Sequence, residues 1–410
     1  MLLSLLSAAF GATPRAGWPA QSRLFALSPE MPLSSAGVVF QSRDTTNFSV
    51  TDTAPEPATC LMDAQGLSAF HAGRGVMYTL LEDCIFAGGP LRSHLIGFSA
   101  ETGALVANVS SLPLLPSESG YVGAGQCVAV DEHRDAVFLI GRDHSGTAKL
   151  WRTDLASNVT MAVGVVAGVA SGIDLLLQGC ALDPTTGVLW ATLPMGDNAT
   201  AYAPSLIGVS TTSSRVLHRL DVYTPYAGPA AIAFDAHRGM VVGIGISVDP
   251  DTHSMNGSTF FEISDSHAGT MGVTTLRAGV LPPSVVAVLG AVATVDAAGR
   301  VFYFECIVAP NTTAVQQQHP LAAPRSESAA WGAIVTGSAT QRGTVGGQPS
   351  RVGVRAPTVV PGRGSVLGLA AQPPLTGLCA LDAHSGAFKF ARGVCTEMAA
   401  CPWNLQYWNN

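Results

Sequence analysis

The sequence predicts an all-β protein and, within that class, a β-propeller. Two observations predict this fold: a hairpin-like phrase recurs along the 410-residue chain, and a second hairpin-like phrase lies between its copies. The composition agrees, because 47% of the residues are hydrophobic and only 12% are charged. Such low charge is expected of sheets that are covered on both faces.

The first phrase consists of a few apolar residues, an aspartate, two or three turn residues often ending in glycine, and a second apolar run. Aspartate hydrogen-bonds its own turn backbone and glycine adopts positive φ, so the phrase predicts two strands joined by a tight turn. Clear copies occupy residues 128–140, 180–192, 232–244 and 293–305. Looser copies begin at Ala69, with His71 in the aspartate position, and at Val359, with Pro361 there.

The second phrase also predicts a hairpin. It is clear at residues 95–109 and 378–391, and weaker at 149–163, 205–220 and 259–276. Because the two phrases alternate, each repeating unit has four strands. One four-stranded sheet cannot bury both of its faces, but units arranged around an axis cover one another, as in a propeller.

The number of blades is estimated from the first phrase. Its aspartate positions, 71, 131, 183, 235, 296 and 361, mark six units. Residues 23–40 look like a second-phrase hairpin without a partner, and the tail 395–410 can supply the missing strands. We therefore expect seven blades, with the closing blade split between the termini. Six blades with an N-terminal extension are the alternative.

The domain organisation is expected to be simple. Residues 1–16 contain an apolar stretch followed by small residues, which is typical of a signal peptide. Residues 17–410 are expected to form a single propeller domain. The polar, low-complexity segment around 310–357 predicts a long flexible insertion in the fifth blade.

The repeating unit resembles those of the propeller superfamily that contains NHL, YVTN and gluconolactonase-like proteins. In that superfamily an A-x-D-x-x-G-x-[IVL]-x-V phrase is followed by L-x-x-x-D-x-x-[TS]-G. Residues 128–140 and 181–192 match the first half, and residues 378–390 match the second. Quinoprotein propellers share the D-x-x-T-G turn, but their docking tryptophan is missing at the matching positions. The resemblance covers most of residues 60–395 and implies a fold rather than an activity.

Sequons and cysteines indicate a secreted or extracellular glycoprotein with disulfide bonds. The six N-x-[ST] sequons are at Asn47, Asn108, Asn158, Asn198, Asn256 and Asn311. The eight cysteines are Cys60, Cys84, Cys127, Cys180, Cys306, Cys379, Cys395 and Cys401. Their pairing stays open, although the last three are close enough in sequence for one bridge. Ordinary turn sequence and free buried cysteines are the alternatives.

Acidic residues at the hairpin turns are the candidates for a metal site. Asp131, Asp183, Asp235 and Asp296 each end the first strand of a hairpin. If these strands are innermost, the carboxylates approach the central channel and can bind Ca²⁺. Alternatively, each carboxylate bonds only its own turn backbone, and no cofactor is expected on that interpretation. The turn histidines His133, His237 and His384 are expected to be exposed.

Other chemical motifs are weak or missing. The loop 249–257 alternates Asp249, Asp251 and His253 but lacks the closing glutamate of a calcium loop, so it is expected to be solvated. The sequence has no G-x-S-x-G nucleophile motif and no C-x-x-C pair. A recognisable catalytic or zinc site is therefore not predicted.

Charge narrows the class of partner. The formal net charge is −7 and the chain has no basic run, so nucleic acid is not an expected partner. No transmembrane segment is expected either. We expect a binding scaffold, rather than an enzyme, that holds a protein or glycan ligand on a propeller rim. The alternative is a divalent-metal-dependent hydrolase or lactonase with its site at the mouth of the central channel.

Overall fold

The computed structural model describes most of the strands and their turns. The described residues are 23–29, 38–44, 50–53, 61–83, 92–114, 125–169, 179–195, 204–220, 229–248, 255–265, 271–296, 300–308, 344–345, 348–349, 359–360, 365–366, 375–395 and 403–408. In β1–β3, β22–β25 and β28 only the course of the backbone is described. The expected signal peptide lies outside the described residues. Among the described residues, no helix is long and apolar enough to cross a membrane.

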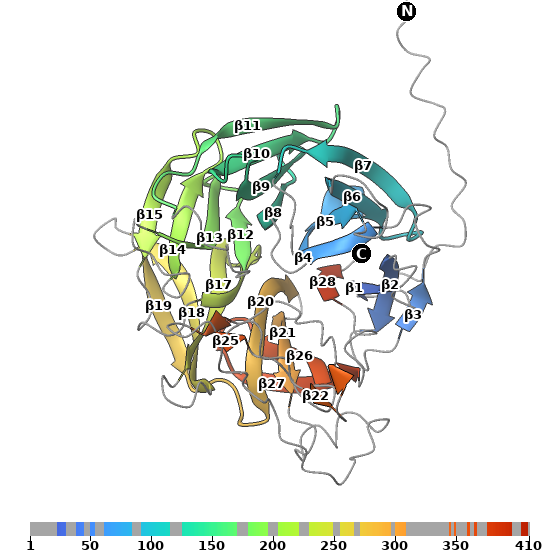
Figure 1. Ribbon diagram of the computed structural model, residues 1–410. Coiled ribbons are helices and arrows are strands. Elements are labelled where there is room, and N and C mark those ends of the chain that lie inside the picture. Colours follow the sequence, from blue (N-terminus) through green and yellow to red (C-terminus); the bar gives the residue numbers. More distant parts are fainter. Residues whose placement is uncertain are drawn as a thin grey trace, which may run out of the picture.

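Five blades, each a four-stranded antiparallel sheet, are arranged around a common centre (Figure 1). Blade 1 contains β4 (Leu61–His71), β5 (Val76–Asp83), β6 (Ser93–Ser99) and β7 (Leu105–Leu112). Blade 2 contains β8 (Gly125–Asp131), β9 (Ala136–Arg142), β10 (Ala148–Asp154) and β11 (Val159–Val165). Blade 3 contains β12 (Cys180–Asp183), β13 (Val188–Pro194), β14 (Pro204–Ser210) and β15 (Val216–Leu220). Blade 4 contains β16 (Pro229–Asp235), β17 (Met240–Val248), β18 (Met255–Asp265) and β19 (Met271–Ala278). Blade 5 contains β20 (Val285–Asp296), β21 (Val301–Val308), β26 (Leu375–Asp382) and β27 (Phe388–Cys395).

The two ends of the chain share a further four-stranded sheet. Its order is β28 (Trp403–Trp408), β1 (Arg23–Pro29), β2 (Val38–Asp44) and β3 (Val50–Thr53). β28 pairs antiparallel with β1 and contacts both β20 of blade 5 and β4 of blade 1. The innermost strands β4, β8, β12, β16, β20 and β28 thus contact one another in turn and form a closed ring.

The predicted number of blades is wrong. The internal repeats build five blades of four strands each rather than the expected seven, and the described residues contain no seventh four-stranded sheet. The six-blade alternative, with residues 23–40 as an extension, also fails, because the described residues of this segment, 23–29 and 38–40, lie in the terminal sheet.

The miscount has a physical cause in the sixth copy of the first phrase. At Pro361 it forms only the two-residue strands β24 (Val359–Val360) and β25 (Ser365–Val366), which are too short to bury a face. The second-phrase hairpin that follows pairs with β21 and completes blade 5. The predicted insertion therefore separates two halves of one blade. It contains the short pair β22 (Thr344–Val345) and β23 (Gln348–Pro349), and residues 309–343 lie outside the described residues.

The hydrophobic core lies between blades rather than inside one sheet. β9 illustrates the arrangement, because all of its residues are buried. Val137 and Leu139 pack in a cluster with blade 1, whereas Phe138 and Ile140 pack in a cluster with blade 3. Alternate side chains of a strand point to opposite faces, so each blade is covered on both sides by its neighbours. Similar clusters join blades 3 and 4 and blades 4 and 5.

Two disulfides reinforce this packing. Cys127–Cys180 joins β8 to β12 and thus ties blade 2 to blade 3, with a Cα–Cα distance of 5.6 Å. Cys306–Cys379 joins the neighbouring strands β21 and β26 of blade 5, with a Cα–Cα distance of 5.9 Å. Cys379 therefore does not take part in the bridge that its sequence distance to Cys395 and Cys401 left possible. The side chains of Cys60, Cys84, Cys395 and Cys401 are outside the described residues.

Candidate functional site

One edge of the propeller, here called the turn rim, carries the turns between the first and second and between the third and fourth strands of each blade. These turns share an edge because first and third strands run in the same direction in an antiparallel sheet. In four blades a backbone hydrogen bond joins the two turns: Ala100 N to Gly75 O (2.7 Å), Leu155 N to Asp135 O (3.0 Å), Thr211 N to Gly187 O (3.0 Å) and Ala383 N to Arg300 O (3.1 Å).

Three of the four predicted metal candidates lie on this rim with each carboxylate engaged in its own turn. Asp131 accepts the backbone N–H of Arg134 at 3.1 Å and the Arg134 guanidinium at 2.7 Å. Asp183 accepts the N–H groups of the next turn residues at 2.9 and 3.3 Å. Asp235 does the same at 3.0 and 3.3 Å. These contacts match the alternative in which each carboxylate bonds its own turn.

The fourth candidate, Asp296, ends β20 and is buried, while the turn that follows it is outside the described residues. Among the described residues, no three histidine, cysteine, aspartate or glutamate side chains gather to hold a metal ion. The loop 249–254 also lies outside the described part of the chain.

Two contacts between blades on the turn rim were not predicted from the sequence. The first seam joins the β4–β5 turn of blade 1 to the β8–β9 turn of blade 2. His71 Nε2 lies 3.2 Å from Asp135 Oδ1, and Arg74 Nε donates to the same oxygen at 2.6 Å. The guanidinium of Arg74 also binds the second carboxylate oxygen. Glu132 accepts the backbone N–H groups of residues 72 and 73 at 2.7 and 3.3 Å.

His71 performs the turn function of the aspartate it replaces. Its Nδ1 accepts the backbone N–H of Arg74 at 3.2 Å, which leaves Nε2 directed toward blade 2. The side chain is buried, so one imidazole serves both the local turn and the seam. The position of His71 in the repeat indicates its turn, but it does not indicate the contact with blade 2.

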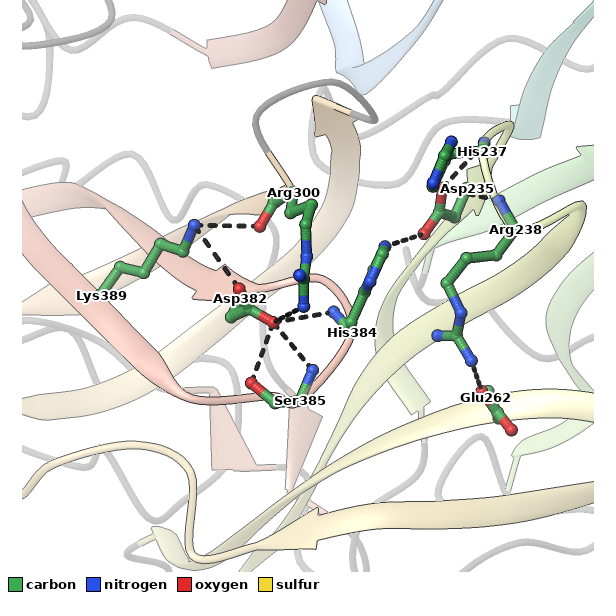
Figure 2. A network of polar contacts seen from close by, with 9 residues as sticks. All are labelled: Asp235, His237, Arg238, Glu262, Arg300, Asp382, His384, Ser385 and Lys389. Atoms are coloured by element: carbon green, nitrogen blue, oxygen red, sulfur yellow. Dashed lines mark hydrogen bonds and ion pairs between the residues drawn. The ribbon is translucent and has the colours of Figure 1, made fainter.

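The second seam joins the β16–β17 turn of blade 4 to the β26–β27 turn of blade 5 (Figure 2). His384 Nε2 points toward Asp235 Oδ2 at 3.7 Å, which is too long for a hydrogen bond. The rings of His384 and His237 stack with their centroids 5.9 Å apart and an interplanar angle of 4°. Asp235 is fully buried, and neither its Oδ2 nor His384 Nε2 has a hydrogen-bond partner among the described groups.

Other charged groups surround the second seam (Figure 2). On the blade 4 side, Arg238 forms an ion pair with Glu262 of β18. On the blade 5 side, Asp382 lies 3.5 Å from the Arg300 guanidinium and 3.7 Å from Lys389 Nζ. The seam therefore places both signs of charge around the two imidazoles.

The pKa values of the rim groups follow from these contacts. The hydrogen bond from Arg74 lowers the pKa of Asp135. Partial burial disfavours the charged Asp382, but hydrogen bonds from Ser385 and from the His384 amide outweigh it and lower its pKa to about 2. Burial lowers the pKa of His384, and the neighbouring Arg300 lowers it further.

The prediction that the turn histidines are exposed is right for two of the three and wrong for His384. His133 and His237 are exposed, whereas His384 is largely covered, with 23% of its side chain exposed. Two of the six sequon asparagines, Asn108 and Asn158, have described side chains, and both are exposed.

The chain has similar solved structures at low sequence identity. No family model matches the sequence, and no curated protein matches it. The chain is similar to the solved structure of TolB from Acinetobacter baumannii, with 10% identity, a TM-score of 0.49, and coverage of 96% of this chain and 68% of that one. A periplasmic gluconolactonase from Pseudomonas aeruginosa gives 14% identity, a TM-score of 0.48, and coverage of 94% and 99%.

The Niastella koreensis GH74 enzyme gives 12% identity, a TM-score of 0.41, and coverage of 65% of this chain and 39% of that one. At such low identity, these likenesses concern the fold alone. The architecture described above makes the chain a β-propeller.

Proposed function

We propose that this protein is a binding scaffold that docks a partner protein on the outer edge of blades 1 to 3 and carries out no chemistry of its own. A strip of exposed aliphatic side chains supports the proposal. It lies on the outermost strands, which face away from the centre of the ring in Figure 1.

The strip, here called the belt, consists of Leu105, Val106, Val159, Met161 and Leu217. These side chains are 42%, 53%, 50%, 53% and 47% exposed, respectively. All five lie near the start of β7, β11 or β15, and hence next to the turn rim. β7 and β11 contact each other across the boundary between blades 1 and 2. With Val165 they are the only large hydrophobic residues exposed in the described part of the chain.

The chemistry of the belt favours a protein over a glycan. Its side chains are aliphatic, with no polar group to bond sugar hydroxyls, and grouped exposed apolar side chains mark protein contact sites. Covering the exposed half of each is worth about 1 kcal/mol. Blade 4 provides a contrast, because the exposed residues of its outermost strand β19 are Thr274, Thr275, Arg277 and Ala278.

The disulfides favour an oxidising compartment, in agreement with a secreted protein. The metal-dependent hydrolase has no comparable support, because the carboxylates of Asp131, Asp183 and Asp235 serve their own turns.

Site-specific photo-crosslinking tests the proposed docking surface. A photo-reactive amino acid replaces Met161 in one protein and Thr275 of β19 in a matched control. We expect one defined cross-linked species from position 161. The yield of this species should be several-fold lower from position 275. Adding Val106→Asp should also lower the yield from position 161 several-fold. Equal cross-linking from positions 161 and 275, or no effect of Val106→Asp, would contradict docking on the belt.

A further inference from the structure

We propose that Asn158 carries an N-linked glycan and that this glycan controls access to the belt. The second half of this inference rests on the proposed function. Asn158, Val159 and Thr160 form a sequon at the start of β11. Two of the exposed belt residues, Val159 and Met161, directly follow the asparagine in this strand.

The turn that contains Asn158 is firmly held. The Asp154 carboxylate accepts the backbone N–H and the hydroxyl of Ser157 at 2.9 and 2.8 Å. Leu155 is buried and donates its N–H to Asp135 O at 3.0 Å. Asn158 itself is exposed and has a φ of 55°, which asparagine tolerates well. The turn therefore presents the amide of Asn158 outward, where a bulky sugar can be accommodated.

The register of β11 determines which belt side chains lie beside the attachment point of the sugar. Thr160 lies opposite Thr153, and their hydroxyls are hydrogen-bonded at 2.7 Å on one face of the sheet. Since side chains alternate along a strand, Val159 and Met161 point to the opposite face of the sheet from Thr160, and both are exposed there. A glycan that starts at Asn158 is therefore rooted beside these two aliphatic side chains.

The second described sequon offers a comparison. Asn108 lies inside β7, opposite Ile96 of β6. Asn158 instead occupies a turn at the tip of a hairpin. Asn158 is also central, because β11 lies on blade 2, between the belt residues of blades 1 and 3.

Mass spectrometry of the full chain secreted from cultured eukaryotic cells tests the modification. Asn158→Gly removes the acceptor and suits the positive φ, while Thr160→Ser keeps the sequon. We expect Asn158→Gly to lose the mass of one glycan relative to wild type, and Thr160→Ser to retain it. Asn108→Asp serves as a control at the other described sequon. An unchanged glycan mass in Asn158→Gly would overturn the inference.

Oxidation of Met161 by hydrogen peroxide tests whether the glycan covers the belt. We expect Met161 to form sulfoxide several-fold more slowly in the glycosylated protein than in Asn158→Gly. Met271 of β19, which is partly buried in blade 4, should oxidise at the same rate in both proteins. Equal rates at Met161 would overturn control of the belt even if the glycan is present.

Cross-linking from Leu105 separates the two proposals. If both are right, the cross-linked species is several-fold more abundant in Asn158→Gly than in the glycosylated protein. An equal yield of the cross-linked species in both proteins would support docking on the belt but would contradict control of the belt by the glycan. If no cross-link forms in either protein, the proposed function fails, while the mass and oxidation results still decide whether Asn158 is modified and shields Met161.

Discussion

The two seams on the turn rim place a histidine opposite an aspartate, but only the first brings the two into hydrogen-bonding distance. His71 lies 3.2 Å from Asp135, whereas His384 lies 3.7 Å from Asp235. Asp135 is partly exposed and fully engaged by Arg74 and His71. Asp235 is buried and has one oxygen without a hydrogen-bond partner among the described groups.

The difference shows that one carboxylate cannot always satisfy the hydrogen bonds of its own turn and those of the boundary between two blades. Asp235 must cap its own turn, so its second oxygen is carried into the boundary between blades 4 and 5, where desolvation is costly. At the first seam the turn is capped by His71, and the carboxylate comes from the opposite blade. We therefore expect blades 4 and 5 to be joined mainly by apolar packing and blades 1 and 2 also by polar contacts.

The largest effect is expected from Gly386→Ala, which tests the apolar packing of the second seam. A Cβ at this position would lie 2.7 Å from the Phe260 side chain of blade 4, and the φ of 67° is unfavourable for alanine. We expect the free energy of unfolding to fall by about 3 kcal/mol in urea titrations. Gly146→Ala is the matched control, because φ is 77° but nothing lies within 4 Å, and about 1 kcal/mol is expected. Equal losses of unfolding free energy in the two variants would mean that blades 4 and 5 move apart to accommodate the added methyl group at no extra cost.

The next effect is expected from Asp235→Ala. The substitution removes the buried carboxylate that accepts the N–H groups of His237 and Arg238. We expect a loss of about 2 kcal/mol in the free energy of unfolding. Asp183→Ala removes the same type of cap from a more exposed turn of blade 3 and should cost about 1 kcal/mol. A gain in stability for Asp235→Ala would show that the unpartnered oxygen outweighs the cap.

A smaller effect is expected from Asp135→Asn in the first seam. Asparagine keeps the shape and tolerates the φ of 49°, but it removes the charge that pairs with Arg74. Because both side chains are 38% exposed, solvent screens the pair and about 0.5 to 1 kcal/mol is expected. Thermal melts should show that the difference in Tm between wild type and Asp135→Asn is smaller in 1 M salt than in low salt. A salt-independent difference would contradict an ionic origin.

The smallest effect is the pH dependence of the second seam. The pKa of His384 is lowered in the folded protein, so on acidification the unfolded chain takes up its proton first. The contribution of neutral His384 to the free energy of unfolding is complete above the unfolded pKa of about 6.5. It is lost as the pH falls through the folded pKa of His384. Between pH 7 and 5.5 the free energy of unfolding of the wild type should fall more than that of His384→Asn. Parallel pH profiles of the two proteins would contradict this assignment.

The sequence predicted the features that depend on neighbouring residues. Asp131, Asp183 and Asp235 cap their turns, and Gly187, Gly239 and Gly386 adopt positive φ, because both properties are set within a few residues. The propeller class followed from the alternation of two hairpins. The blade count did not follow, because a count of hairpin phrases cannot tell which hairpins pair across an insertion.

The seams could not be predicted because they join residues that are distant in sequence. His71 and Asp135 are 64 residues apart, and nothing near either residue indicates the partner. The same holds for Cys306 and Cys379, whose separation of 73 residues spans the insertion. Such contacts depend on the angle at which one blade packs on the next. Phe260 of blade 4 and Phe302 of blade 5, for example, meet edge to face across one such boundary, with their ring centroids 5.8 Å apart.

The pairing of β28 with β1 determines when this molecule can finish folding. During synthesis β1 leaves the ribosome early, and its inner edge must wait while the five blades are made. An unpaired strand edge can bind other chains, so this interval is when the protein is most prone to aggregate. Proteins that hold nascent chains would be needed most at that stage, before the last strand is released and takes its place beside the first.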